Sequence, residues 1–261
     1  MVARRNIKNL GKLIFVRVLF PSLLLFALLP TATFAEENTD NCLKLGADES
    51  FSGFHPLFED LVASIYKRAG YCAVSIPLTP KRIQKMLGAG SLDSDWFRVE
   101  GYEDQFDLDL MAIPIPLFQI EAVLLYRTDS DFDGTPEDLQ GRTVGYQSGF
   151  RWLEKGLPAL GATPREIPTG VPVDELLMRG RFEIFATDSV RAHLTMQSQN
   201  DGKNTLRQTS WKKLSFFHLV HRRHQDKIEA LKREIKRAMD AGEFDQIFAL
   251  PGLSRVVTAE D

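Results

Sequence analysis

Cysteines are scarce in this sequence, and no metal-ligating residues surround them. Only Cys42 and Cys72 occur among 261 residues. A zinc site in a protein uses three or four cysteine, histidine or carboxylate ligands, and a nucleophilic cysteine needs a base close to it. Neither cysteine has such partners at a suitable spacing. The sequence therefore predicts no metal site, no cofactor and no catalytic cysteine.

Positive charge is also in short supply. The 32 lysine and arginine residues are outnumbered by 35 aspartate and glutamate residues, which gives a formal net charge of −3 at pH 7. Nucleic-acid binding draws its affinity largely from the neutralisation of phosphates. An acidic chain without a basic tract is therefore not expected to bind nucleic acid.

Three motifs of catalytic or metal chemistry are present only in part. Gly145 stands three places before Ser148, whereas the nucleophile elbow of a hydrolase has its glycine two places before the serine. The acidic run at 129–134 begins like a calcium-binding loop, but Gln140 stands where a bidentate glutamate is required. The three histidines within 218–224 do not converge, and we expect the first to be partly buried and the others to be at the surface. The sequence therefore predicts that the protein is not an enzyme.

The longest apolar run lies close to the N-terminus. Five basic residues within the first 17 positions precede this run at 19–29, and Thr33 and Ala35 place small side chains three and one positions before a cleavage point. This order is typical of a secretory signal peptide, and the run is shorter than the ~20 residues that span a bilayer. We predict cleavage of residues 1–35 and export to the periplasm. Cleavage takes five basic and no acidic residues from the 261, so 226 residues remain with a net charge of −8.

The two cysteines each stand just before a short apolar run. These runs lie at 43–45 and 73–76. Two cysteines usually pair in an oxidising compartment. If the runs are neighbouring parallel strands, their first residues lie side by side, within the ~4.4 to 6.8 Å between Cα atoms that a disulfide requires. We therefore predict a structural disulfide between Cys42 and Cys72.

Short β-like runs alternate with longer helical runs along the chain. This alternation is typical of an α/β sheet with crossover helices. The expected strands are 43–47, 72–77, 121–126, 143–146, 182–186 and 214–220, and the segments 92–96 and 110–115 are strand-like or irregular. The expected helices are 57–69, 80–87 with Thr79 as its cap, 150–157, 173–179, 189–197, 227–239 and 244–248, with a helical turn at 136–139. Two α/β units joined by two strands, near 121–127 and 214–220, are the architecture that we infer.

The order of the motifs resembles the family 3 solute-binding proteins of ABC importers, the type that binds polar amino acids. The most specific stretch is 137–149, which reads Glu-Asp-Leu-Gln-Gly-Arg-Thr-Val-Gly-Tyr-Gln-Ser-Gly. Further matches lie at 43–51, 87–98, 123–127 and 181–188, so the resemblance covers nearly the whole mature chain. It implies a two-lobed, type II periplasmic-binding-protein fold with a hinge of two crossing strands. Lobe 1 would comprise residues 36–124 and 217–261, and lobe 2 residues 125–216.

The resemblance also implies a ligand site between the lobes. In the family an arginine forks onto a ligand carboxylate, and an aspartate accepts the ligand ammonium group. These roles fall on Arg98 and Asp188, while Asp48 and Phe51 fall where a polar contact and a ring are placed. The remaining candidates lie in the loop and first turn of the expected helix at 150–157, where backbone N–H groups can meet an anion: Gln147, Ser148, Gly149 and Arg151.

Other roles for these residues stay open. Arg98 also has acidic neighbours at 93, 95 and 100 with which to pair, and Asp188 is well placed to cap the helix that starts at Ser189. The family usually carries a Gly-x-Thr-x-Thr-x-x-Arg stretch, whereas here the residues 93–98 are shorter and lack the threonines. The resemblance therefore supports an amino-acid-like ligand less directly than it supports the fold.

The resemblance implies reversible binding of a small charged or zwitterionic metabolite and delivery to an ABC permease in the inner membrane. Two alternatives use the same scaffold. One is a periplasmic enzyme such as a cyclohexadienyl dehydratase, which needs an acid in the cleft, and Asp48 and Glu49 are the candidates for it. The other is a sensory module for a membrane receptor, because fold does not fix function.

Overall fold

The computed structural model describes residues 41–49, 55–102, 104, 108–198 and 205–255. The strands are β1 Leu43–Asp48, β2 Ala73–Leu78, β3 Ser94–Val99, β4 Leu110–Ala112, β5 Phe118–Arg127, β6 Thr143–Gln147, β7 Thr163–Ile167, β8 Ile184–Asp188 and β9 Leu206–His221. The α-helices are α1 His55–Arg68, α2 Pro80–Gly88, α4 Arg151–Ala159, α5 Val173–Met178, α6 Ser189–Ser198, α7 Ile228–Asp240 and α8 Asp245–Phe248. Two short 3-10 helices are η3 Glu137–Leu139 and η4 Arg222–Lys227. The predicted signal peptide and Phe51 lie outside the described residues.

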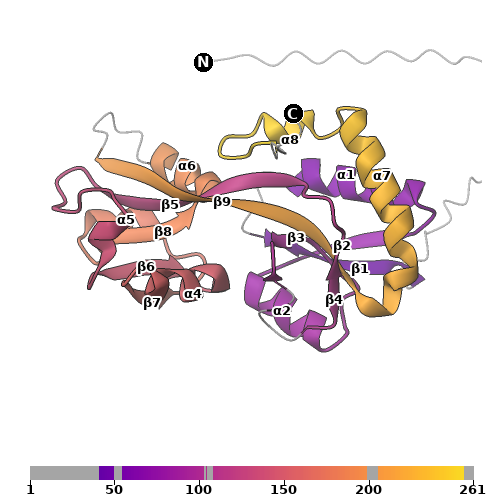
Figure 1. Ribbon diagram of the computed structural model, residues 1–261, viewed down its shortest axis with the longest axis horizontal. Coiled ribbons are helices and arrows are strands. Elements are labelled where there is room, and N and C mark those ends of the chain that lie inside the picture. The colour runs from indigo at the N-terminus through magenta and orange to yellow at the C-terminus, as the bar shows by residue number, and fades with distance from the viewer. Residues whose placement is uncertain (1–40, 50–54, 103, 105–107, 199–204, 256–261) are drawn as a thin grey trace, which may run out of the picture. The chain divides into compact units, whose positions relative to one another are not determined.

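Two parallel groups of strands flank one long antiparallel pair. The strand order is β2-β1-β3-β9-β5-β8-β6-β7, with β4 also paired to β9. β5 and β9 pair along their length from Phe118↔Phe216 to Arg127↔Leu206, and Figure 1 shows them running side by side from one group to the other. Together they form the two crossing strands that the sequence predicts. The fold is therefore the two-lobed α/β architecture, with β1–β3 in lobe 1 and β6–β8 in lobe 2.

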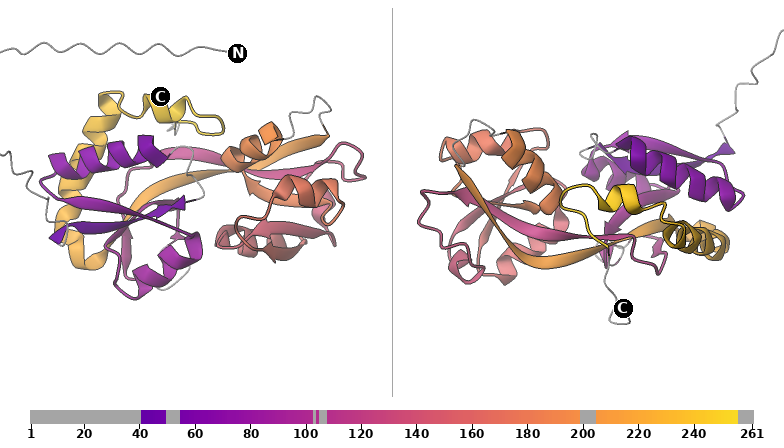
Figure 2. Two further views of the ribbon diagram at one scale, coloured as in Figure 1. Left: turned by 180° about the vertical axis from the view of Figure 1, so that it is seen from behind. Right: turned by 90° about the horizontal axis from the view of Figure 1, so that it is seen from above.

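Helices cover the strands because each α/β unit must bury an apolar helix stripe against its sheet. In lobe 1, α1 and α2 lie on opposite faces of the β1–β3 strands (Figure 2). One cluster of buried side chains joins these elements to α7 and α8, and two further clusters gather side chains of β6, β8 and α4–α6. The predicted lobe boundaries at 124/125 and 216/217 fall within β5 and β9, and they stay predictions.

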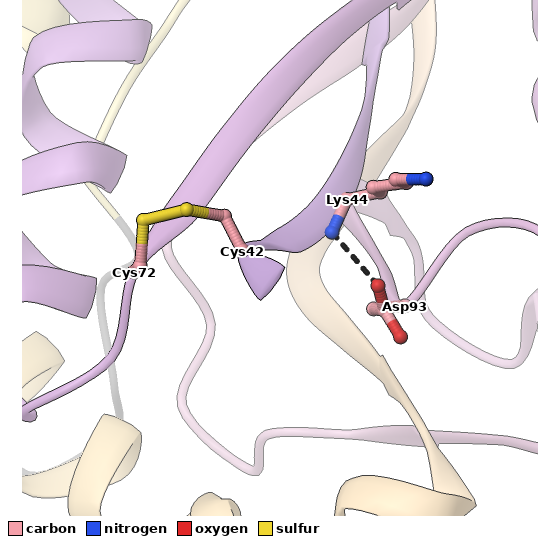
Figure 3. Close-up of a disulfide and its surroundings, with 4 residues drawn as sticks. All are labelled: Cys42, Lys44, Cys72 and Asp93. Carbon is pink, nitrogen blue, oxygen red and sulfur yellow. Dashed lines mark hydrogen bonds between the residues drawn. A yellow bond between two sulfur atoms is a disulfide. The ribbon is translucent and has the colours of Figure 1, made fainter. Parts of the chain in front are cut away.

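The predicted disulfide is confirmed. Cys42 and Cys72 are bonded, with their Cα atoms 4.7 Å apart. They directly precede β1 and β2, which are parallel and paired at Leu43↔Ala73, so the two strand starts do lie side by side. On the other edge of β1, the backbone N–H of Lys44 donates to the carboxylate of Asp93 at 2.8 Å (Figure 3).

Most expected strands are present with bounds shifted by a few residues, and β7 and β9 differ most. β7 was not predicted, because its sequence Thr-Pro-Arg-Glu-Ile is polar and it is an exposed strand at the sheet edge, where proline is tolerated. β9 begins eight residues earlier than the expected strand, since its polar first half pairs with β5. The sheet partner, rather than local hydrophobicity, sets the length of β9.

Two side chains also differ from expectation. Thr79 occupies the N-cap position of α2, but its side chain makes no capping hydrogen bond. His218 is buried rather than partly exposed, with only 3% of its surface accessible. Its ring is satisfied on both sides, because Nδ1 lies 2.9 Å from the carbonyl oxygen of Trp96 and Nε2 lies 2.7 Å from the hydroxyl of Tyr66. Within the described residues, no helix is both long and apolar enough to cross a bilayer.

Candidate functional site

A pocket lies where the carboxyl ends of strands from the two lobes face each other, and we call it the central pocket. β1 has β2 on one side and β3 on the other, so the chain reverses its winding direction there, and such switch points are where open α/β sheets bind ligands. Asp48 ends β1 and Asp188 ends β8. The pocket is lined by Asp48, Pro80, Arg98, Val99, Tyr102, Ile120, Gly149, Phe150, Arg151, Trp152, Asp188, Arg191 and Phe216.

Arg98 and Asp188 line this one pocket from opposite lobes. Arg98 lies on β3, where the pairing with β9 shifts register between Asp95 and Arg98. Such a bulge re-aims the side chains of a strand, and bulges occur often beside functional sites. The pocket has a cavity volume of about 40 Å³, and a single water needs about 10 to 15 Å³ on the same measure. The space between the lobes is therefore narrow in this arrangement.

The charged groups of the site form an alternating chain across the two lobes. Nε of Arg98 lies 2.7 Å from Oδ2 of Asp95, and Nη1 of Arg98 lies 3.8 Å from Oδ2 of Asp48. The same oxygen of Asp48 lies 3.3 Å from Nη2 of Arg191. Nη1 of Arg191 in turn contacts Oδ2 of Asp188. Every member of this chain is less than 10% exposed, so each charge depends on its neighbours rather than on water.

Asp188 is fully buried and holds the start of α6. Its Oδ1 accepts the backbone N–H of Arg191 at 2.9 Å, as an N-cap carboxylate does, and its Oδ2 accepts the guanidinium of Arg191. The capping role that the sequence left open is therefore present, and the residue lines the central pocket as well.

Arg98 has hydrogen-bonding capacity that the described residues do not fill. Its Nη2 is buried and has no hydrogen-bond partner among them. Burial opposes its charge, but the carboxylates of Asp95 and Asp48 and the neighbouring Tyr102 outweigh that cost and raise the pKa of Arg98. The guanidinium therefore stays charged, and a buried N–H without an acceptor costs free energy until one arrives.

Asp95 lies behind Arg98, next to the pocket. It is 1% exposed, and burial raises its pKa to about 6, although Arg98 draws the value downward. Its carboxyl therefore titrates near neutral pH rather than near its ordinary 3.8. Asp95 is not itself a lining residue of the pocket.

Aromatic rings support the two arginines. The Cζ atom of Arg98 lies 5.3 Å from the ring centroid of Tyr102, and that of Arg191 lies 4.6 Å from the centroid of Phe150. Guanidinium groups at these distances gain cation–π attraction, which grows when water is excluded. Arg98 and Tyr102 belong to lobe 1, and Arg191 and Phe150 to lobe 2, so each lobe contributes one such arginine–ring pair to the pocket.

The remaining predicted residues are divided between two places. Gly149 and Arg151 line the central pocket, and Arg151 pairs with Glu154 at 2.5 Å. Gln147 lines a second, more open pocket together with Glu49, and Arg191 borders both pockets. Arg98, Asp188 and Asp48 therefore share the central pocket with Gly149 and Arg151, whereas Gln147 does not line it. Phe51 lies outside the described residues.

The backbone N–H of Ser148 was expected to be available to an anion, and the structure differs. Its backbone N–H donates to the carbonyl oxygen of Ile167 at 2.8 Å, because β6 and β7 continue their pairing to that point, so this N–H does not face a ligand. The Lys81 ammonium and the Ser148 hydroxyl lower the pKa of the Glu166 carboxyl. Ser148 belongs to neither pocket's lining.

Arg191 is the main site residue that the sequence analysis missed. It lies three places after Asp188, in the first turn of α6, and a residue at that spacing shares the face of the helix cap. That spacing was readable in the sequence, but its partner Asp48 is 143 residues away. Tyr102 was also missed, and Asp95 was named only as a possible partner of Arg98, although both contact Arg98 from within four positions in the sequence.

The lobes also touch beside the pocket. A Cβ atom added to Gly149 would lie 2.7 Å from Cβ of Pro80, at the start of α2. Nearby, Nζ of Lys81 lies 2.6 Å from a carboxylate oxygen of Glu166 on β7. Gly149 is therefore a point of close approach between lobe 1 and lobe 2 that leaves no room for a side chain.

Comparisons with known proteins place the chain by fold. No family model matches the sequence, and no curated protein matches it. Among solved structures, the P235GK mutant of ArgBP from T. maritima has a TM-score of 0.63 at 20% identity, covering 79% of this chain and 93% of that one. A histidine kinase sensor domain with similarity to periplasmic binding proteins has a TM-score of 0.66 at 14% identity, covering 83% and 98%.

A third similar structure is the ancestral amino-acid-binding protein AncCDT-1, a precursor of cyclohexadienyl dehydratase. Its TM-score is 0.62 at 16% identity, covering 79% of this chain and 93% of that one. All three structures match over most of their length, so the chain has the fold of periplasmic binding proteins. The predicted fold class is confirmed, and identities of this size carry no more than the fold.

Proposed function

We propose that this protein is an exported solute-binding protein that captures a small charged or zwitterionic metabolite between its two lobes and delivers it to an ABC permease. The main support is that Arg98 of lobe 1 and Asp188 of lobe 2 line one narrow pocket. Closure of the lobes removes water from such a pocket, and charge-assisted hydrogen bonds are stronger there than in water. Binding needs no covalent step and no cofactor.

The geometry gives the dehydratase alternative less support. That reaction needs an acid that gives a proton to a leaving group. Asp48 lines the central pocket, but its Oδ2 is paired with the guanidinium groups of Arg98 and Arg191, at 3.8 and 3.3 Å. Glu49 lines the second pocket instead. A sensory role rests on the similarity to a histidine kinase sensor domain, and the same pocket would serve it.

A thermal-shift screen of the purified protein tests the proposal. The screen covers amino acids, polyamines, organic acids and amines. A ligand at 100 times its Kd stabilises the folded state by about 2.7 kcal/mol, which for a chain of this length raises Tm by roughly 5 to 10 °C. Flat melting curves across all four classes would contradict binding of a small charged metabolite, and consumption of the hit compound by the protein alone would support the enzyme instead.

Pull-down tests the partner. The proposal predicts that a membrane permease co-purifies with the protein when its ligand is present. Retention of a receptor kinase in place of the permease would favour the sensory alternative.

A further inference from the structure

The hydrogen bonds and charges around the central pocket indicate which chemical groups a ligand can carry. This inference rests on the proposed binding function. Three arginines but only two aspartates line the pocket, namely Arg98, Arg151, Arg191, Asp48 and Asp188. A ligand ammonium group requires a carboxylate that is open to it, and a ligand carboxylate requires an open donor. Arg98 provides an open donor, whereas Asp48 and Asp188 already pair with Arg191.

Both carboxylate oxygens of Asp188 already accept a hydrogen bond within the protein. One accepts the backbone N–H of Arg191 and the other its guanidinium, and the side chain is fully buried. Asp48 faces the same cation, because its Oδ2 lies 3.3 Å from Nη2 of Arg191. The guanidinium of Arg191 therefore occupies the position between the two carboxylates where a ligand ammonium would have to bind.

Arg191 is held firmly in that position. Its side chain is 10% exposed, and its Cζ atom lies 4.6 Å from the centroid of the Phe150 ring. Moving it aside for an ammonium group would leave a buried guanidinium without its carboxylates, which is strongly destabilising.

The opposite side of the pocket has an open donor. Nη2 of Arg98 is buried and without a hydrogen-bond partner among the described residues, and Arg98 lines the pocket. An oxygen of a ligand carboxylate would satisfy it. The buried carboxyl of Asp95 titrates with a pKa of about 6, so protonation there leaves the charge of Arg98 less compensated and strengthens its attraction for an anion.

We infer that the ligand is a small organic carboxylate without an ammonium group, bound through Arg98 from lobe 1, with Arg191 taking the place that an ammonium group of an amino acid would fill. The narrow pocket favours compounds of few atoms. The inference narrows the ligand class of the proposed function from charged or zwitterionic metabolites to anions.

Titration calorimetry with matched pairs of compounds tests this inference. Each pair shares one carbon skeleton and differs at the α-position: pyruvate and L-alanine, succinate and L-aspartate, and 2-oxoglutarate and L-glutamate. At least one acid is expected to bind at least about tenfold more tightly than its amino partner. An amino acid that binds as tightly as its partner, or more tightly, overturns the inference but leaves the proposed function standing. Failure of all six compounds, together with a flat thermal-shift screen, overturns both.

Two variants make the test specific for Arg191. Replacement Arg191→Gln removes the internal cation and opens both carboxylates, so the ratio of the two affinities within a pair is expected to shift toward the amino acid by about tenfold or more. Replacement Arg179→Gln is the control, because that arginine is 72% exposed, pairs with Glu175 on α5 and lines neither pocket. An unchanged ratio in a folded Arg191→Gln protein would contradict the assigned role of Arg191.

Discussion

Nη2 of Arg191 on α6 lies 3.3 Å from Oδ2 of Asp48 at the end of β1, and this buried ion pair joins the two lobes. Arg191 also pairs with Asp188 in its own lobe, so separation of the lobes would break the pair with Asp48 and keep the pair with Asp188. Asp48 would then lose the cation of Arg191, and the lost interaction costs free energy unless water or a ligand replaces it. We therefore expect lobe movement and ligand binding to be coupled through these three side chains.

Close approach at Gly149 gives the first prediction. Gly149→Ala places a Cβ atom 2.7 Å from Cβ of Pro80, in a backbone with φ of +92°. The positive φ costs about 1–2 kcal/mol of stability, and the clash keeps the lobes apart and weakens ligand binding by about tenfold. Gly141→Ala is the control, since its φ is +77° and no atom lies within 4 Å of the added Cβ. Calorimetry that gives equal Kd values for the two variants would show that the contact with Pro80 does not matter for binding.

The disulfide gives the second prediction. Replacement of both Cys42 and Cys72 by serine removes a link across 30 residues, which lowers the free energy of unfolding by about 3–4 kcal/mol in the chain-entropy model. Urea unfolding of the two proteins, with and without a reducing agent, measures this loss. Reduction should destabilise the native protein and leave the double variant unaffected. Equal stabilities of the native and variant proteins under oxidising conditions would contradict the prediction.

His218 gives a prediction for pH. Burial lowers its pKa from 6.5 to about 4, despite its bond to Trp96. The unfolded chain therefore binds more protons than the folded protein between these values, so stability is lost as pH falls from about 6.5 to 4. Asp95 acts with the opposite sign, because its raised pKa makes the folded protein bind the extra proton between its ordinary 3.8 and about 6. A variant is needed to separate the two contributions.

The variant is His218→Gln, which keeps a polar group between Tyr66 and Trp96 but does not titrate. We expect the variant to be less stable than the native protein at pH 7, and the difference to shrink as pH falls toward 4. Urea unfolding at a series of pH values measures it. Parallel stability curves for the two proteins would mean that His218 does not titrate between the folded and unfolded states.

The sequence predicted the parts of this fold that follow from local patterns. Alternating apolar runs identified most strands and helices, and the apolar runs after Cys42 and Cys72 led to the disulfide. The strands, helices and disulfide were predictable because the apolar periodicity of neighbouring residues indicates burial and element type. Arg98 and Asp188 came instead from the family resemblance, and both line one pocket, while their ligand roles stay predictions.

Other parts required the tertiary structure. β7 is a polar edge strand with no apolar pattern, and the first half of β9 is a strand because β5 pairs with it. Arg191 finds one partner three residues away and another 143 residues away. Its position between two carboxylates is a property of the assembled lobes, which no local spacing contains.

Loss of the Arg98 guanidinium tests the central claim most directly. Because Arg98→Met alone would leave Asp95 buried beside an uncharged side chain, the variant carries Asp95→Asn as well, which removes both charges of the pair. The Kd of the compound that stabilises the native protein is measured by calorimetry for both proteins, after circular dichroism shows that both are folded. Capture by a guanidinium in the central pocket predicts a Kd at least about 30-fold higher in the double variant, as loss of a charge-assisted pair implies. A Kd unchanged within about threefold would contradict the account.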